Sequence, residues 1–255
     1  MEVTLIEDQE FFRDTTRKFL EVECPIATVR SLRDSESGFD RGYWRQGAAL
    51  GWISLLVGEE LGGGSISGQG LVDLTLVAEE FGGHASPGPL VPANVVAAAL
   101  ARSGSDEHRR DLIPAIIAGE LVPAWVVGPP DGAATRSSVV ASAHGDEFVL
   151  SGAESVVEAA AHADLLLVAA VLGDGLAQFL VSPDQPGVRI TPLESLDLTK
   201  RYARVELDDA RVSGSAAVGV PGGAFDDVER QRRVALVIQV SESVGAARAV
   251  FAVTL

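Results

Sequence analysis

The stretch SSVVASAHGDEFVLSGAES, residues 137–155, shows the pattern that decides the fold. Two runs rich in Val, Phe and Leu lie on either side of HGDE, whose Gly and Asp are typical of a hairpin turn. Similar short runs, separated by turn residues, continue from Leu121 to about Val212. The pattern predicts an antiparallel β domain of about seven or eight strands.

The chain before this β region has a helical pattern. Helices are predicted at 41–51, 70–81, 92–103 and 106–118. The last should begin at an N-cap at Ser105 or Asp106 and should end at Gly119. An earlier helix, ended by Pro25, is predicted from side chains that recur near a 3.6-residue period: Phe11, Phe12, Thr15, Phe19 and Val22.

The chain after the β region returns to a helical pattern in AFDDVERQRRVALVIQVSESVGAARAVFAVTL, residues 224–255. A helix of about 30 residues would be about 45 Å long. It is charged at its start and apolar on most faces after Val234, as is typical of a helix in a bundle core. We therefore expect the segments that cover it to follow Leu255.

These patterns together predict an α+β multidomain chain. An all-helical domain is expected at residues 1–120 and a middle antiparallel β domain at 121–220. Residues 221–255 are expected to form the first helix of a C-terminal helical bundle.

The composition argues against several partners. The formal net charge of -16 should repel nucleic acid and anionic membranes, since both carry phosphates, so neither is expected to bind. The apolar run VALVIQV, residues 234–240, is too short to span a bilayer. The N-terminus has no basic segment followed by a long apolar run, so no secretory signal is expected. The basic residues are almost all Arg, with lysines only at Lys18 and Lys200.

The single cysteine, Cys24, excludes an intrachain disulfide and any Cys-based metal site. A reducing, cytoplasmic location is therefore expected. No metal site is predicted, because the histidines are scattered without ligand spacing and are expected at surface or turn positions: His84, His108, His144 and His162.

Other motifs do not indicate a catalytic site. LGGGSISGQG, residues 61–70, lacks the preceding strand and the Gly-Lys-Ser ending of a phosphate-binding loop, and is read as a turn between helices. No Gly-x-Ser-x-Gly element is present, which argues against a serine hydrolase. The adjacent pairs Glu59–Glu60 and Glu79–Glu80 are read as solvated or capping groups.

The order of all-helical domain, β domain and long helix resembles that of acyl-CoA dehydrogenases. The local sequences resemble that family in the same order, over essentially the whole chain: LGWISLLVGEELGG (50–63), LVAEEFGGHASPGPL (76–90), SDEHRRDLIPAIIAGELVPAWVV (105–127), GDEFVLSGAES (145–155), AHADLLLVAA (161–170) and GVRITPLESLDLTKRYARVELDDARV (187–212).

The resemblance implies an FAD-dependent α,β-dehydrogenation of an acyl-CoA. In the family a carboxylate removes the α-proton, and the β-hydride passes to N5 of the flavin. The family holds the flavin with an x-Thr-Glu-Pro-x-x-Gly-Ser-Asp loop and a Trp-Ile-Thr/Ser-Asn stretch. By that resemblance, the cofactor-binding candidates in this chain are Trp125, Val127, Gly128, Val156, Val157 and Glu158.

Both flavin segments depart from the family pattern. Gly128 and Pro129 stand in place of Thr and Glu, and VVEA at 156–159 replaces the Trp-Ile-Thr-Asn stretch. A valine side chain donates no hydrogen bond, and the Glu158 carboxylate would face electron-rich flavin oxygens. Main-chain donors remain, so FAD bound by this chain, or at an interface with a partner, stays open. Ordinary packing remains the alternative reading for Trp125 and for the two valines.

No catalytic residue is predicted in this chain. One position that the family uses for its base, early in the long helix, holds Ala235, and the other would lie after Leu255. Glu242 lies more than a turn further along the same helix and is not proposed as the base.

Three functions remain open from the sequence. The first is a non-catalytic subunit of a heteromeric acyl-CoA dehydrogenase, paired with a homologous subunit and acting on an acyl-CoA of steroid type. The second is a homotetrameric FAD-dependent acyl-CoA dehydrogenase whose C-terminal bundle follows Leu255. The third is a non-enzymatic binding or scaffold protein on the same fold.

Overall fold

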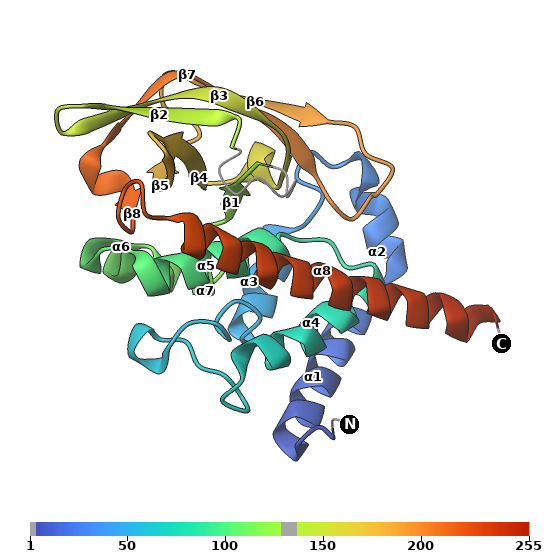
Figure 1. Ribbon diagram of the computed structural model, residues 1–255. Coiled ribbons are helices and arrows are strands. Elements are labelled where there is room, and N and C mark those ends of the chain that lie inside the picture. The colour runs from blue at the N-terminus through green and yellow to red at the C-terminus, as the bar shows by residue number, and fades with distance from the viewer. Residues whose placement is uncertain (1–3, 129–136, 255) are drawn as a thin grey trace.

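The computed structural model describes residues 4–128 and 137–254. The helices of the N-terminal half gather on one side, the strands form a sheet on the other, and a long helix runs along the boundary between them (Figure 1). The predicted order of helices, strands and long helix is confirmed. The C-terminal end of the long helix projects beyond the rest of the molecule (Figure 1).

The N-terminal region holds seven α-helices among the described residues. The predicted helix at 106–118 is divided at Leu112, two residues before Pro114, whose ring nitrogen cannot donate to a continuous helix. The predicted cap is present, because the Ser105 hydroxyl accepts a hydrogen bond from the His108 amide at 3.1 Å. The helices are α1 Glu7–Glu23, α2 Ile26–Ser31, α3 Arg41–Ala49, α4 Gly70–His84, α5 Leu90–Ser103, α6 Asp106–Asp111 and α7 Ile113–Ile117.

The buried face of α1 differs from the predicted one. Phe11 and Val22 are 74% and 72% exposed, whereas Phe12 is buried. The buried positions include Gln9 and Thr16, which bind the Asp73 carboxylate and the Trp52 indole N–H. The apolar period missed this face because polar side chains can be buried when each finds a hydrogen-bond partner.

Two other predictions for charged groups in the helical region are wrong. Glu80 is buried rather than solvated, because the Arg17 guanidinium binds both of its carboxylate oxygens, at 3.0 and 3.2 Å. His108 is also buried, next to the cap that it completes. Within residues 4–128 and 137–254, no group of three or more His, Cys, Asp or Glu residues could hold a metal ion.

The middle region is an eight-stranded sheet with the order β6-β7-β3-β2-β4-β5-β8, and β1 pairs with β4. The sheet is mixed rather than purely antiparallel, because β1 and β2 both run parallel to β4. The remaining pairings are antiparallel, including the predicted β2–β3 hairpin. The strands are β1 Pro123–Val126, β2 Val139–His144, β3 Glu147–Glu158, β4 Leu165–Leu172, β5 Gly175–Val181, β6 Val188–Leu193, β7 Tyr202–Ser213 and β8 Ala217–Val218.

The long helix α8, Phe225–Thr254, packs closely against α4. Gly82 on α4 and Gly245 on α8 allow this approach. A Cβ on Gly82 would overlap the Glu242 carbonyl, and one on Gly245 would overlap the Glu79 carbonyl. The close approach places Glu242 beside the helical domain and fixes the axial position of α8.

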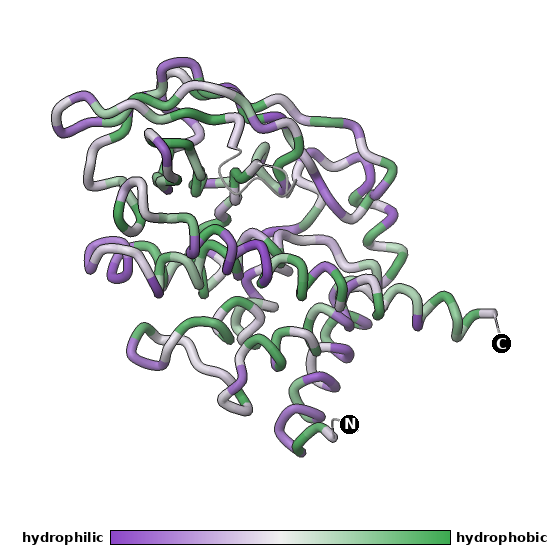
Figure 2. The backbone as a smooth tube through the Cα atoms, viewed as in Figure 1, coloured by the Kyte–Doolittle hydropathy of each residue, from purple (hydrophilic) through white to green (hydrophobic). Residues whose placement is uncertain are grey.

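By length and composition alone, α8 could cross a membrane. An 18-residue window has a mean hydropathy of 1.4, and only 17% of that window is buried within the chain. The run at 234–240 is too short to span a bilayer by itself, but small residues such as Gly245 and the alanines after it extend the apolar segment. A membrane-spanning helix and the core helix of a bundle can have the same length and the same mean hydropathy, so these two properties do not distinguish them. Figure 2 shows the hydrophobic colour continuing toward the C-terminal end.

Candidate functional site

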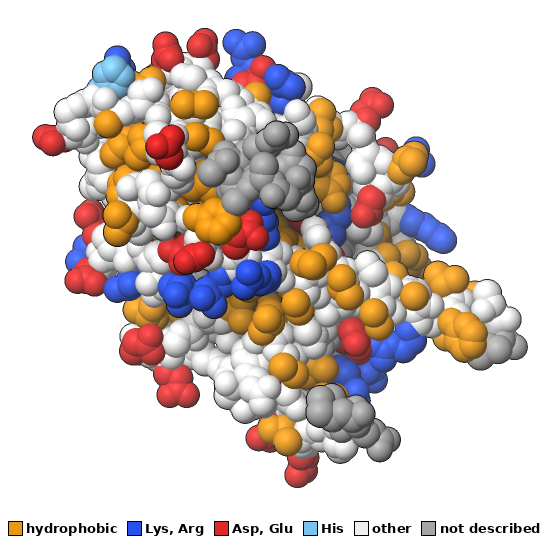
Figure 3. All heavy atoms as spheres, in the orientation of Figure 1, with side chains coloured by type: hydrophobic (Ala, Val, Ile, Leu, Met, Phe, Trp, Pro, Cys, Tyr) orange, Lys and Arg blue, Asp and Glu red, His pale blue; other side chains and the backbone are white. Residues whose placement is uncertain are grey.

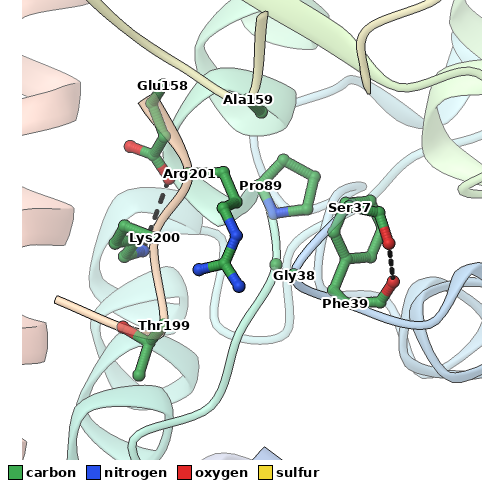
Figure 4. Close-up of a pocket in the computed structure, with 10 residues that line it drawn as sticks. Ser37, Gly38, Phe39, Pro89, Glu158, Ala159, Thr199, Lys200 and Arg201 are labelled. Carbon is green, nitrogen blue, oxygen red and sulfur yellow. Dashed lines mark hydrogen bonds and ion pairs between the residues drawn. The ribbon is translucent and has the colours of Figure 1, made fainter. Parts of the chain in front are cut away.

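Three charged side chains meet where the end of β3, the segment before β7 and the middle of α8 come together. The Lys200 ammonium lies 2.9 Å from a Glu242 carboxylate oxygen and 3.4 Å from one of Glu158. The three side chains are only 11%, 15% and 13% exposed, respectively. Figure 4 shows the Glu158 carboxylate pointing toward Lys200. We call these three residues the Lys200 cluster.

The local backbone explains why Glu158 and Lys200 meet. Glu158 ends β3 and pairs with Tyr202 at the start of β7, so the chain just before β7 passes beside it. Ala159 then adopts a left-handed conformation, with φ of 61°, and turns the chain away from the sheet. The Ala159 amide donates to the Arg201 carbonyl at 2.7 Å and holds the two segments together.

The electrostatics of the cluster are dominated by burial and by the pairing of opposite charges. Burial alone would lower the pKa of Lys200, but Glu158 and Glu242 outweigh it and hold this pKa above its ordinary value. Burial raises the pKa of the Glu158 carboxyl, an effect that the Lys200 charge opposes. Lys200 therefore stays protonated, and its positive charge is paired with the two carboxylates.

Arg201 joins the same segment to the N-terminal helices. Its guanidinium donates to the carbonyls of Leu32 and Arg33 at 3.0 and 2.9 Å. In Figure 4 it lies between Lys200 and the Gly38 backbone, where Pro89 also lines the pocket. The cavity that remains measures about 10 Å³, which is room for about one water molecule.

The predicted cofactor residues of the first segment lie at the junction of β1 and α8. The Trp125 indole N–H donates to Gln231 on α8 at 3.0 Å, and Gln231 also bonds to the buried Gln178 of β5. Val127 packs against a small buried apolar cluster. The Gly128 carbonyl accepts from Arg232 at 3.1 Å. Pro129, the other departure in this segment, lies outside the described residues.

The predicted cofactor residues of the second segment do not share one surface. Val156 is 66% exposed, at a bulge where β3 loses register with β7. Val157 is buried in the core of the sheet, and Glu158 faces Lys200. The structure therefore brings Trp125, Val127 and Gly128 together at one place, and puts Glu158 in the Lys200 cluster.

Comparisons with known proteins agree with this architecture. The acyl-CoA dehydrogenase N-terminal domain matches residues 6–120. Acyl-CoA dehydrogenase FadE12 of Mycobacterium tuberculosis is 29% identical over 196 residues, which cover 71% of this chain and 49% of FadE12. The solved ChsE4-ChsE5 complex from Mycobacterium tuberculosis has a TM-score of 0.84 at 26% identity, over 96% of this chain and 65% of that one.

A variant of the Tcur3481-Tcur3483 steroid acyl-CoA dehydrogenase also has a TM-score of 0.84, at 28% identity over 97% of this chain and 65% of that one. Residues 6–120 therefore match the N-terminal domain of acyl-CoA dehydrogenases, and nearly the whole chain shares the fold of these two solved structures. The chain spans about half the length of FadE12 and about two thirds of the lengths of these solved structures.

Acyl-CoA dehydrogenases of the family are flavoproteins, so the candidate residues can be tested for their fit to a flavin. The polar side-chain donors at these positions already have partners within the chain. The Trp125 N–H donates a hydrogen bond to Gln231, and the Lys200 ammonium forms ion pairs with two carboxylates. Val156 offers no side-chain donor. The described side chains therefore do not fit the pyrimidine edge of a flavin, which needs hydrogen-bond donors.

The base position that lies within the described residues, early in α8, holds no carboxylate. Ala235 is buried, and Glu242 is bound to Lys200. Lys200 is the central residue that the sequence reasoning missed. Its signal was that it is one of only two lysines in a chain whose other basic residues are Arg.

Proposed function

We propose that this chain is the non-catalytic subunit of a heteromeric acyl-CoA dehydrogenase, in which a homologous chain carries the base and the FAD. The observation that carries the proposal is the Lys200 cluster. It uses Glu158, in the segment that resembles the family's flavin stretch, and Glu242, on the long helix, as ion-pair partners. A general base must instead have a carboxylate within reach of the substrate proton.

The relatives support a heteromer. Two of the solved structures that this chain resembles are named with two chains, ChsE4-ChsE5 and Tcur3481-Tcur3483, and the second is a steroid acyl-CoA dehydrogenase. Both are more than 25% identical to this chain over nearly its whole length. We therefore infer a steroid-type acyl-CoA thioester as the substrate class of the assembly.

The surface of α8 is suited to packing against other helices. Hydrophobic side chains lie along the outer part of this helix in Figure 3. Contiguous exposed apolar surface favours association. The apolar side chains of α8 that are about half exposed or more are Leu236, Val240, Val244, Val250, Phe251 and Val253.

The role of this chain in the proposed assembly is structural: it binds the partner subunit. The α,β-dehydrogenation itself would use the partner's carboxylate to remove the α-proton and its flavin to accept the hydride. This chain would contribute helix packing and a fixed domain junction, which the Lys200 cluster and Arg201 hold together.

The proposal is tested by turnover of the assembly of this chain with a homologous acyl-CoA dehydrogenase chain. Glu158→Gln and Glu242→Gln should each leave turnover within about tenfold, whereas losing a general base costs 10²–10⁴-fold. Changing the partner's carboxylate to Gln should cause that larger loss. A loss of the larger size from Glu158→Gln or Glu242→Gln, with the fold and the flavin retained, would place the base in this chain.

A further inference from the structure

Burying the charges of the Lys200 cluster costs desolvation free energy, so the presence of the cluster at this position needs an explanation. Taking three charged groups out of water is expensive, and an ion pair between buried groups compensates for this only when its geometry is good. The Glu158 contact is an ion pair at 3.4 Å, and in the described part of the chain its Oε1 atom accepts no hydrogen bond. The cluster is therefore a poor way to gain stability, compared with apolar side chains of the same volume.

The position of the cluster is the important observation. Glu158 belongs to the segment at 156–159 that resembles the family's flavin stretch, while Glu242 comes from α8 on the other side. Lys200 lies between them and spans the gap between the sheet and the long helix. The pocket beside this cluster, lined by Glu158, Ala159 and Lys200 among others, measures about 10 Å³.

The charge of the cluster also opposes a flavin. Two carboxylates and one ammonium sum to a net charge of about −1 when all three are ionised. An electron-rich ring edge needs hydrogen-bond donors or a free positive charge, and the carboxylates already use the only cation of the cluster. The charge of the cluster therefore opposes a flavin ring at Glu158.

We propose that Lys200, held between Glu158 and Glu242, closes the position at which a flavin ring would meet the 156–159 segment, so that this segment binds no flavin. The cluster serves instead as a clasp between the β domain and α8. This inference deepens the proposed function, because it explains how one chain of a heteromer can keep the family fold while leaving the flavin to its partner.

The direct test places a charge at Val156, which is exposed and therefore tolerates substitution. Val156→Asp and the matched control Val140→Asp, at a valine that is 50% exposed on β2, are each compared with the unchanged chain. FAD is titrated into the chain alone, and flavin content is measured in the assembly with the homologous partner. We expect no saturable FAD binding to the chain alone, and flavin content in the assembly within twofold of the unchanged protein for both variants.

A tenfold or larger loss of FAD affinity or flavin content in Val156→Asp but not in Val140→Asp would overturn the inference. If no partner assembly forms and the chain alone binds no FAD, the proposed function fails while the closed site stands. If the chain alone binds FAD near one per chain and Val156→Asp weakens that binding, the closed site fails whatever the function.

A second set of variants tests Lys200 itself. In any flavin-containing assembly, Lys200→Met should leave the position of the visible flavin bands unchanged, because no flavin lies against this lysine. The control is Lys18→Met, at the exposed lysine of α1. A shift of the flavin bands in Lys200→Met, absent in Lys18→Met, would show that the lysine faces the ring.

Discussion

Removing the Lys200 ammonium should strongly destabilise the fold. Lys200→Met keeps the length of the side chain but leaves Glu158 and Glu242 facing each other in a site where each is about 15% exposed or less. Breaking a buried ion pair by removing one partner costs about 3–5 kcal/mol. For a chain of this size each kcal/mol shifts the midpoint of thermal unfolding by roughly 2–4 °C, so the expected shift is roughly 6–20 °C.

The pH dependence gives this prediction a second readout. Burial already holds the pKa of Glu158 above its ordinary value, and removing Lys200 removes the charge that opposes this shift. A carboxyl whose folded-state pKa is raised contributes stability below its unfolded-state pKa of 4.5, and that stability is lost as the pH rises through the folded-state pKa. The penalty of Lys200→Met should therefore be smaller at pH 5 than at pH 7.5.

The assay is urea denaturation followed by tryptophan fluorescence, at both pH values. Lys18→Met should change the free energy of unfolding by no more than about 0.5 kcal/mol, as surface substitutions usually do. The triple variant Lys200→Met, Glu158→Gln and Glu242→Gln should recover most of the loss, because no buried charge then lacks a partner. A loss of less than about 1 kcal/mol for Lys200→Met would refute the reasoning, since it would be typical of a solvated, exposed pair.

Three further outcomes follow from the same structure. Asp73 accepts hydrogen bonds from Ser67, Gln9 and Ile66, which outweigh its burial and lower its pKa below 3.8. Its contribution to stability should therefore be lost as the pH falls through that lowered pKa. In an acid titration the free energy of unfolding should fall less steeply for Asp73→Asn than for the unchanged chain, and an identical profile would contradict the assignment. Gly245→Ala should lower the free energy of unfolding by about 1–3 kcal/mol, because the added Cβ would overlap the Glu79 carbonyl. Ala246→Ser, at an exposed position of the same helix, should leave it unchanged in the same urea assay. Equal effects of the two substitutions would show that α4 and α8 can separate freely. The apolar surface of α8 should cause self-association at micromolar concentration, and sedimentation as a stable monomer would count against it.

The sequence predicted the elements whose signals are local. The β2–β3 hairpin follows from the turn residues at HGDE. The start of α6 follows from Ser105, whose hydroxyl accepts a hydrogen bond from the backbone N–H three residues later. The family resemblance extended this to the order of the domains. Each of these features is decided by residues close together in the chain.

The features that sequence reasoning missed depend on distant partners. Gln9 is buried because Asp73 lies 64 residues away to receive its hydrogen bond, and an apolar period carries no record of that partner. The parallel pairing of β1 with β4 was missed because an apolar strand looks the same whichever way its neighbour runs. Lys200 lies 42 residues from Glu242, and the two meet because α8 packs against α4 while the segment before β7 is held beside the end of β3.

The visible spectrum of the purified chain, alone and with a homologous acyl-CoA dehydrogenase chain, tests the central claim most directly. A non-catalytic subunit with a closed flavin position should show no flavin absorbance when purified alone, even after incubation with FAD. The same chain should appear in a yellow, active assembly once the partner is added. Flavin at near equal molarity in the chain alone would contradict the account, because the Lys200 cluster could not then occupy the ring position.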